Sequence, residues 1–285
     1  FTHRFGPNHS RTLMIRVILG HALTVEGRYA EAETELKTAM AGLVKRVGPN
    51  HLETARCYFE LGRLYSTQRL WDKAAGWSYA AWQAVSHTFG PGSAVGLQMQ
   101  SVHAIDIAHL GRTEEALHLA EQAQAQEQKL LDSANPRYVT TLFALGGVYA
   151  QLHRRADEQR VVDEYRAIVE RPLFVGNPAL GFLVAGSHFL DAQLAKDDGD
   201  RDTARREADI ARQLYEKDRD FGYVADVDDF VKTLGAAAPA ATVPLSSAAV
   251  QEAQWGDDCG VAASLASSRL VARAASVQIL RGNRY

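Results

Sequence analysis

A short phrase returns along this chain at a fixed interval. "FGPNHSRT" at residues 5–12 recurs as "VGPNHLET" at 47–54, with a weaker form, "FGPGSAVG", at 89–96. The three Gly-Pro pairs are separated by two steps of 42 residues, and related marks follow at Ala134-Asn135-Pro136 and Gly176-Asn177-Pro178. A fixed period of this length indicates one supersecondary unit that is copied several times.

Each interval contains two segments with the spacing of an amphipathic helix. Residues 55–67 and 71–87 place apolar side chains at helical intervals and avoid strict alternation. Short polar turns separate such segments, most clearly at Gly27-Arg28, Gly111-Arg112 and Gly199-Asp200. Glycine there can adopt a positive φ and end the first helix. The repeated unit is therefore predicted to be a helical hairpin.

The repeated phrase is predicted to be the hinge between one hairpin and the next. Gly48 is expected to end a second helix in the αL conformation. Pro49 prevents the helix from continuing, because it has no N–H and its ring clashes with the preceding turn. Asn50 or Thr54 is then expected to cap the next helix.

Small residues recur at equivalent sites of both segments, which suits close packing of helices. They are Gly20, Gly62, Ala104, Gly146 and Ala192 in the first segments, then Ala32, Ala74, Ala116 and Ala204, and Ala39, Ala81, Ala123 and Ala211, in the second. A single hairpin cannot bury its faces alone, whereas stacked hairpins form one continuous core.

These residues resemble the tetratricopeptide repeat, whose pattern is L-G-x-x-Y, a turn, and two spaced alanines. "LGRLY" at 61–65 with Ala74 and Ala81 is the closest match, and the 42-residue period resembles the kinesin-light-chain-like, bacterial type. The resemblance covers about residues 1–220 and implies an all-α, right-handed α-solenoid of about five helix-turn-helix repeats. Later repeats depart from the pattern at His103, Glu158, Tyr165 and Asp191.

We divide the chain into three parts. Residues 1–235 form the helical repeat domain, and 223–235 are predicted to be a C-terminal capping helix. Residues 236–260 read as a flexible linker by composition. Residues 261–285 are expected to be a helix or a disordered basic tail, which either docks on a partner or membrane surface or is mobile or packed against the end of the solenoid.

The composition argues against several classes of partner. A net charge of −3 and a pI of about 6.4 give no support for nucleic-acid or membrane binding. The two cysteines are too few for a disulfide framework, so a cytoplasmic location is expected. The first residues read as the end of a helix, which suggests a further domain upstream in the same parent chain.

No catalytic motif with the required spacing is present, so no catalytic residue, metal or cofactor is predicted. Cys57 and His21 form the most tempting nucleophile pair, but a core cysteine explains the pattern better. The acidic run at 196–202 lacks the closing glutamate and the glycine position of a calcium loop, so we interpret it as a capped turn. Cys259 is read as an incidental thiol, and His9 and His51 as structural hinge residues.

The resemblance implies that the first helices line a concave groove that binds a peptide. The groove residues it implies are Val17, His21, Arg56, Phe59, Arg63, Ser101, Ile105, Phe143, Phe189 and Gln193. Phe59, Phe143 and Phe189 occupy one equivalent site, which is consistent either with an aromatic row in the groove or with packing between repeats. The arginines are expected to orient a ligand carboxylate.

These observations favour a non-catalytic scaffold that binds a peptide or protein segment in the groove. The alternative is a regulatory or sensor segment of a larger bacterial protein that contains a kinase, an NTPase or a transcription regulator.

Overall fold

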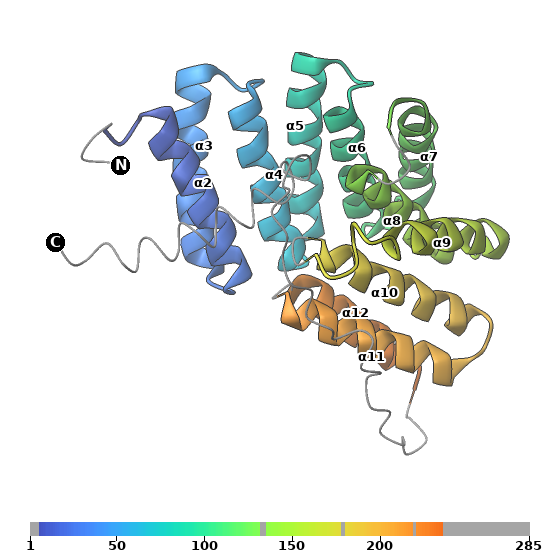
Figure 1. The fold of residues 1–285 in the computed structure, drawn as a ribbon. Helices are drawn as coiled ribbons and strands as arrows, with labels where there is room; N and C mark the ends of the chain where they lie inside the picture. Colours follow the sequence, from blue (N-terminus) through green and yellow to red (C-terminus); the bar gives the residue numbers. More distant parts are fainter. Residues whose placement is uncertain (1–5, 132–134, 178–179, 219–220, 236–285) are drawn as a thin grey trace.

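The fold is described from a computed structural model, which defines residues 6–131, 135–177, 180–218 and 221–235. The described residues form helices without any strand (Figure 1). The helices are α2 (Ser10–Val25), α3 (Tyr29–Val47), α4 (Leu52–Thr67), α5 (Trp71–Phe89), α6 (Ala94–Ala108), α7 (Thr113–Leu130), α8 (Pro136–Gln151), α9 (Arg155–Val169), α10 (Gly181–Asp197), α11 (Arg201–Lys217) and α12 (Phe221–Thr233). The predicted all-α fold is confirmed.

The helices pair in chain order into five antiparallel hairpins, α2–α3 through α10–α11. Each hairpin packs on the next through the second helix of one and the first helix of the other, and at three of the four junctions the two first helices also contact each other. The two segments expected at 55–67 and 71–87 are α4 and α5, each extended by a few residues. The predicted solenoid of five repeats is therefore confirmed.

The hinge between hairpins differs in detail from the prediction. Gly48 has φ 93° and ψ 165°, which is an extended conformation open almost only to glycine and is not αL. His51 is the N-cap, because its Nδ1 accepts the backbone N–H of Glu53 at 3.2 Å. The expected caps, Asn50 and Thr54, were wrong: the Thr54 hydroxyl instead donates to the Gly48 carbonyl at 2.8 Å. Sequence rules favour small polar caps, so the histidine was missed.

The earlier copy of the phrase folds in the same way. The Nδ1 atom of His9 accepts the N–H of Arg11 at 3.2 Å, and the Thr12 hydroxyl donates to the Gly6 carbonyl at 2.9 Å. The repeated Gly-Pro-Asn-His-x-x-Thr phrase therefore encodes one hinge geometry, which requires glycine at its start and a histidine cap.

The turns inside the hairpins follow the prediction at three of their glycines. Gly27, Gly111 and Gly199 have φ of 75°, 76° and 80°. In the second and fourth hairpins, however, the same place is held by Arg69 and His153, with φ of 59° and 53°. A residue with a Cβ is strained in this left-handed backbone conformation, so each of these two turns costs some stability.

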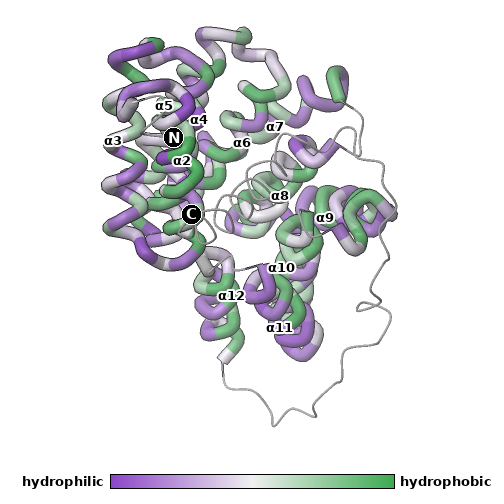
Figure 2. Tube along the Cα trace, turned by 60° about the vertical axis from the view of Figure 1, so that its left-hand side comes forward, coloured by the Kyte–Doolittle hydropathy of each residue, from purple (hydrophilic) through white to green (hydrophobic). Residues whose placement is uncertain are grey.

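The small residues sit where the sequence predicts close packing. The alanines at the two repeated sites of the second helices are all fully buried: Ala32, Ala39, Ala74, Ala81, Ala116, Ala123, Ala204 and Ala211. A Cβ at Gly20 would lie 2.5 Å from the Leu36 side chain, so only glycine fits there. Apolar and polar residues alternate along most helices (Figure 2), as expected when one side of each helix is covered.

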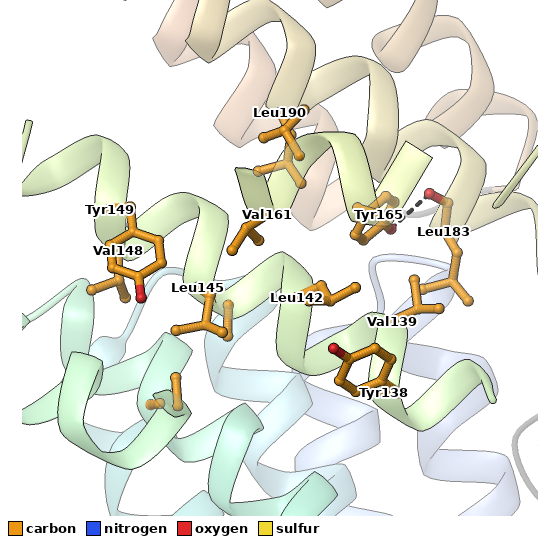
Figure 3. Packing of buried hydrophobic residues seen from close by; sticks show 14 of the residues in the cluster. Tyr138, Val139, Leu142, Leu145, Val148, Tyr149, Val161, Tyr165, Leu183 and Leu190 are labelled. Atoms are coloured by element: carbon orange, nitrogen blue, oxygen red, sulfur yellow. Dashed lines mark hydrogen bonds between the residues drawn. The ribbon is translucent and has the colours of Figure 1, made fainter. Parts of the chain in front are cut away.

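Most of the residues that depart from the repeat pattern are accommodated by a neighbouring side chain or backbone group. The Tyr165 hydroxyl donates to the Leu183 carbonyl at 2.7 Å within the central cluster (Figure 3). A Cβ at Gly186 would lie 2.7 Å from that hydroxyl, so a glycine makes room for the ring. His103 lies 3.0 Å from the Ser78 hydroxyl. Glu158 is fully buried and neither of its carboxylate oxygens has a hydrogen-bond partner in the described structure.

The solenoid curves enough for its last described helix to return to its second hairpin. Figure 1 shows α12 beneath the ends of α4 and α5. The Arg69 guanidinium, at the α4–α5 turn, is paired with Asp226 and Asp229 of α12. Gly222 of α12 approaches Thr67 so closely that a Cβ would lie 3.1 Å from the Thr67 Cα.

The predicted capping segment is thus a helix, although it begins at residue 221 and ends at 233 instead of spanning 223–235. The proposed linker (236–260), the tail (261–285) and Cys259 lie outside the described residues.

Candidate functional site

The predicted groove residues lie on the first helices of the five hairpins. One equivalent position is filled along the solenoid by Val17, Phe59, Ser101, Phe143 and Phe189. Val17, Ser101 and Phe189 are buried, whereas Phe59 and Phe143 are half-buried. The Ser101 hydroxyl hydrogen-bonds to the Thr141 hydroxyl at 2.7 Å, so this serine links neighbouring repeats.

The helix α4 brings together a basic and aromatic strip. Arg56, Phe59 and Arg63 follow one another at intervals of three and four residues, so they share one face of the helix. All three are half-buried. An aromatic ring between two guanidinium groups suits contact with a ligand that carries both apolar and anionic groups.

A buried ionic cluster lies beside this strip. The Nδ1 atom of His21 lies 3.0 Å from Glu60 Oε2 and 2.9 Å from Arg63 Nη1. Burial opposes ionisation of Glu60, but the charges of His21 and Arg63 outweigh burial and lower its pKa to about 2. His21 is 4% exposed, so it is covered by its neighbours, and its contact with Arg63 helps to hold that side chain in place.

The phenylalanines of the fourth and fifth repeats contact α12. The ring of Phe143 meets that of Tyr223 edge-on at 5.9 Å between centroids, and Phe189 meets Phe230 in the same way at 5.6 Å. Both therefore take part in packing between elements. Ile105 and Gln193 are half-buried, and the Gln193 side-chain oxygen has no hydrogen-bond partner in the described structure.

The candidate nucleophile pair is not assembled. The Cys57 thiol donates to the Leu36 carbonyl at 3.3 Å, while His21 is engaged with Glu60 and Arg63. Burial raises the pKa of Cys57 to about 12, so the thiol stays protonated and unreactive. The acidic run at 196–202 is a capped turn as interpreted, with the Asp200 carboxylate accepting the Thr203 N–H at 3.0 Å.

Sequence reasoning missed a second cluster between α10 and α11. One ligand-type atom from each of His188, Asp191 and Glu207 lies within 4.8 Å of the other two. The available signal was Asp191, which stands where the pattern has leucine, three residues after a histidine on the same helix.

A shallow cleft of about 790 Å³ lies along the seam of the first hairpin. Its lining includes Leu13, Arg16, Thr38, Ala41 and Lys45 and contains none of the predicted groove residues. Within the described parts of the chain, we find no helix that is long and apolar enough to cross a membrane.

Comparison with known proteins identifies the repeat. Residues 10–78 match the family model described as tetratricopeptide repeat. No curated protein matches the chain.

Three solved structures of helical repeat proteins resemble this one. The kinesin-light-chain TPR-like repeats of Podosopora anserina, which are nearly identical to one another, share 21% identity over 73% of this chain and 97% of theirs. In two crystal structures they give TM-scores of 0.54 and 0.52. BtubC (BKLC) from P. vanneervenii shares 17% identity over 83% of this chain and 87% of its own, with a TM-score of 0.55.

Residues 10–78 thus match the tetratricopeptide repeat by sequence, and the described chain shares the fold of the kinesin-light-chain TPR-like repeats and of BtubC.

Proposed function

We propose that this chain is a non-catalytic scaffold that binds a peptide or protein segment along the face formed by its first helices. Tetratricopeptide repeats generally mediate contacts between proteins. The observation that carries the proposal is the strip Arg56–Phe59–Arg63 on α4, which stays half-buried while the equivalent Phe189 is covered. Half-buried aromatic and arginine side chains are the types that most often dominate binding energy at protein interfaces.

The strip suits an extended ligand better than a small molecule. Small-molecule sites are enclosed cavities that cover most of the ligand. The residues of the strip do not line the cleft at the first hairpin, and they follow the axis of one helix over about two turns. Phe59 would supply apolar contact, and the arginines would pair with carboxylates of the bound segment.

The test is a peptide array probed with the full chain and with Phe59→Ala and Arg63→Gln. We expect both variants to lose at least about tenfold in affinity for peptides that the parent chain captures, since each removes a central contact. Tyr79→Ala is the matched control, because it removes an exposed aromatic ring from the second helix of the same hairpin. Unchanged binding by both folded variants would reject the assignment of this face.

A further inference from the structure

The cluster formed by His188, Asp191 and Glu207 differs from the rest of the solenoid in its chemistry. His188 and Asp191 lie one turn apart on α10, and Glu207 faces them from α11. The Nδ1 atom of His188 lies 2.9 Å from Glu207 Oε2. The three side chains are 31%, 17% and 18% exposed, so they are held in place and remain open to solvent.

We propose that these three residues bind a divalent transition-metal ion of the Zn²⁺ type, which would tie α10 to α11. One imidazole nitrogen with two carboxylate oxygens is a donor set that suits zinc. Three protein ligands also leave a coordination position for water or for a group of a partner. This site is separate from the peptide-binding face and does not depend on it.

The geometry needs only a small adjustment. A metal–ligand distance of about 2.1 Å in a tetrahedral site places donor atoms about 3.4 Å apart. The donor atoms here lie within 4.8 Å of one another, so rotation of the side chains brings them into place.

Two arginines compete with the ion. Arg166 of α9 is paired with Asp191, and Arg206 Nε lies 3.4 Å from Glu207 Oε1. Arg166 also holds Asp163 at 3.0 Å, so it keeps a partner when Asp191 turns to a metal. Arg166 holds Asp191 through two hydrogen bonds, so a bound ion must displace this bidentate pair, and its three converging ligands offset that loss.

The experiment titrates the metal-free full chain with ZnCl₂ in competition with a chromophoric chelator. We expect one equivalent of Zn²⁺ to bind, and His188→Ala to weaken it at least about tenfold. Arg166→Gln should bind Zn²⁺ several-fold more tightly, because the competing guanidinium is gone. His118→Ala, which removes an exposed histidine on α7, is the control and should match the parent chain.

Several results would overturn the proposal. They are the lack of stoichiometric Zn²⁺ binding, equal affinities of the parent chain and His188→Ala, or a loss in His118→Ala as large as that in His188→Ala. Circular dichroism checks that each variant is folded. If His188→Ala is not, the Arg166→Gln result decides, since a merely structural role for the cluster predicts no gain in metal affinity.

Discussion

The first two hairpins and the last two use the same architecture with different side chains. At the site where the pattern has leucine, the second hairpin has Leu61, which is fully buried, and the fifth has Asp191, which is paired with Arg166. At the first alanine site, the second hairpin has Ala74 and the fourth has Glu158, both fully buried. The family model matches only residues 10–78, where the pattern is kept. The later hairpins show that this fold tolerates such exchanges: Arg166 of the neighbouring repeat pairs with Asp191, whereas the Glu158 carboxylate has no hydrogen-bond partner in the described structure.

One pair of equivalent positions, which joins the two helices of each hairpin, makes a different contact in each repeat. In the first three hairpins it is an ion pair between Arg16 and Glu35 at 2.6 Å, a ring contact between Tyr58 and Trp77 with centroids 5.6 Å apart, and a hydrogen bond from the Gln100 side chain to the Leu119 carbonyl at 2.8 Å. In the last two it is a pair of core residues, Leu142 and Val161, and a contact between His188 and Glu207 at 2.9 Å. The repeated alanine sites are fully buried, so replacements there should have the largest consequences.

The largest expected effect is at Tyr165, which fills an alanine site of the fourth hairpin. Tyr165→Ala removes a fully buried ring and its hydrogen bond to Leu183, and Gly186 cannot fill the space. We expect the free energy of unfolding in urea to fall by about 3–4 kcal/mol. Tyr79→Ala, at an exposed ring, should cost less than about 1 kcal/mol. If the two variants lost similar amounts, the contacts of the Tyr165 ring with Gly186 and Leu183 would not stabilise the fold as described.

A smaller effect of opposite sign is expected at Glu158, the replacement that lacks a compensating partner. Burial raises the pKa of its carboxyl to about 7, with a further contribution from Asp197. We expect Glu158→Ala to raise the free energy of unfolding by about 1–2 kcal/mol at pH 8, because it removes an unpaired buried charge.

The pH dependence sharpens this prediction. Because the pKa is raised in the folded chain, the stabilising contribution of the protonated carboxyl is complete below about pH 4.5 and is lost as the pH rises through about 7. The advantage of Glu158→Ala should therefore shrink toward pH 5. Glu158→Gln keeps the shape of the side chain without its charge and should show the same trend. If the difference in the free energy of unfolding between these variants and the parent chain did not change with pH, the raised pKa of Glu158 would be contradicted. Glu127 is also fully buried with a pKa raised to about 7, so it leaves a residual slope in both variants.

The sequence was enough to predict the parts that depend on local rules. The 42-residue period and the helical spacing predicted the hairpins and their order. The recurring alanines predicted where small residues let the helices pack closely. The return of α12 to α4 was not predictable, because the Arg69–Asp226 pair joins residues 157 positions apart and depends on the summed curvature of the repeats. For the same reason, the sequence alone left open whether Phe143 and Phe189 line a groove or pack between elements.

The smallest expected effect separates the two turns that keep a non-glycine residue at positive φ. His153→Gly relieves backbone strain and should raise the free energy of unfolding by about 0.5 kcal/mol. Arg69→Gly gains the same relief but loses the pairs with Asp226 and Asp229, and the Asp226 side chain is only 16% exposed. We therefore expect Arg69→Gly to be destabilising, and the gap between the two variants to narrow at 1 M salt as charges are screened. Equal effects in the two turns would show that the ion pairs between Arg69 and α12 add nothing to stability.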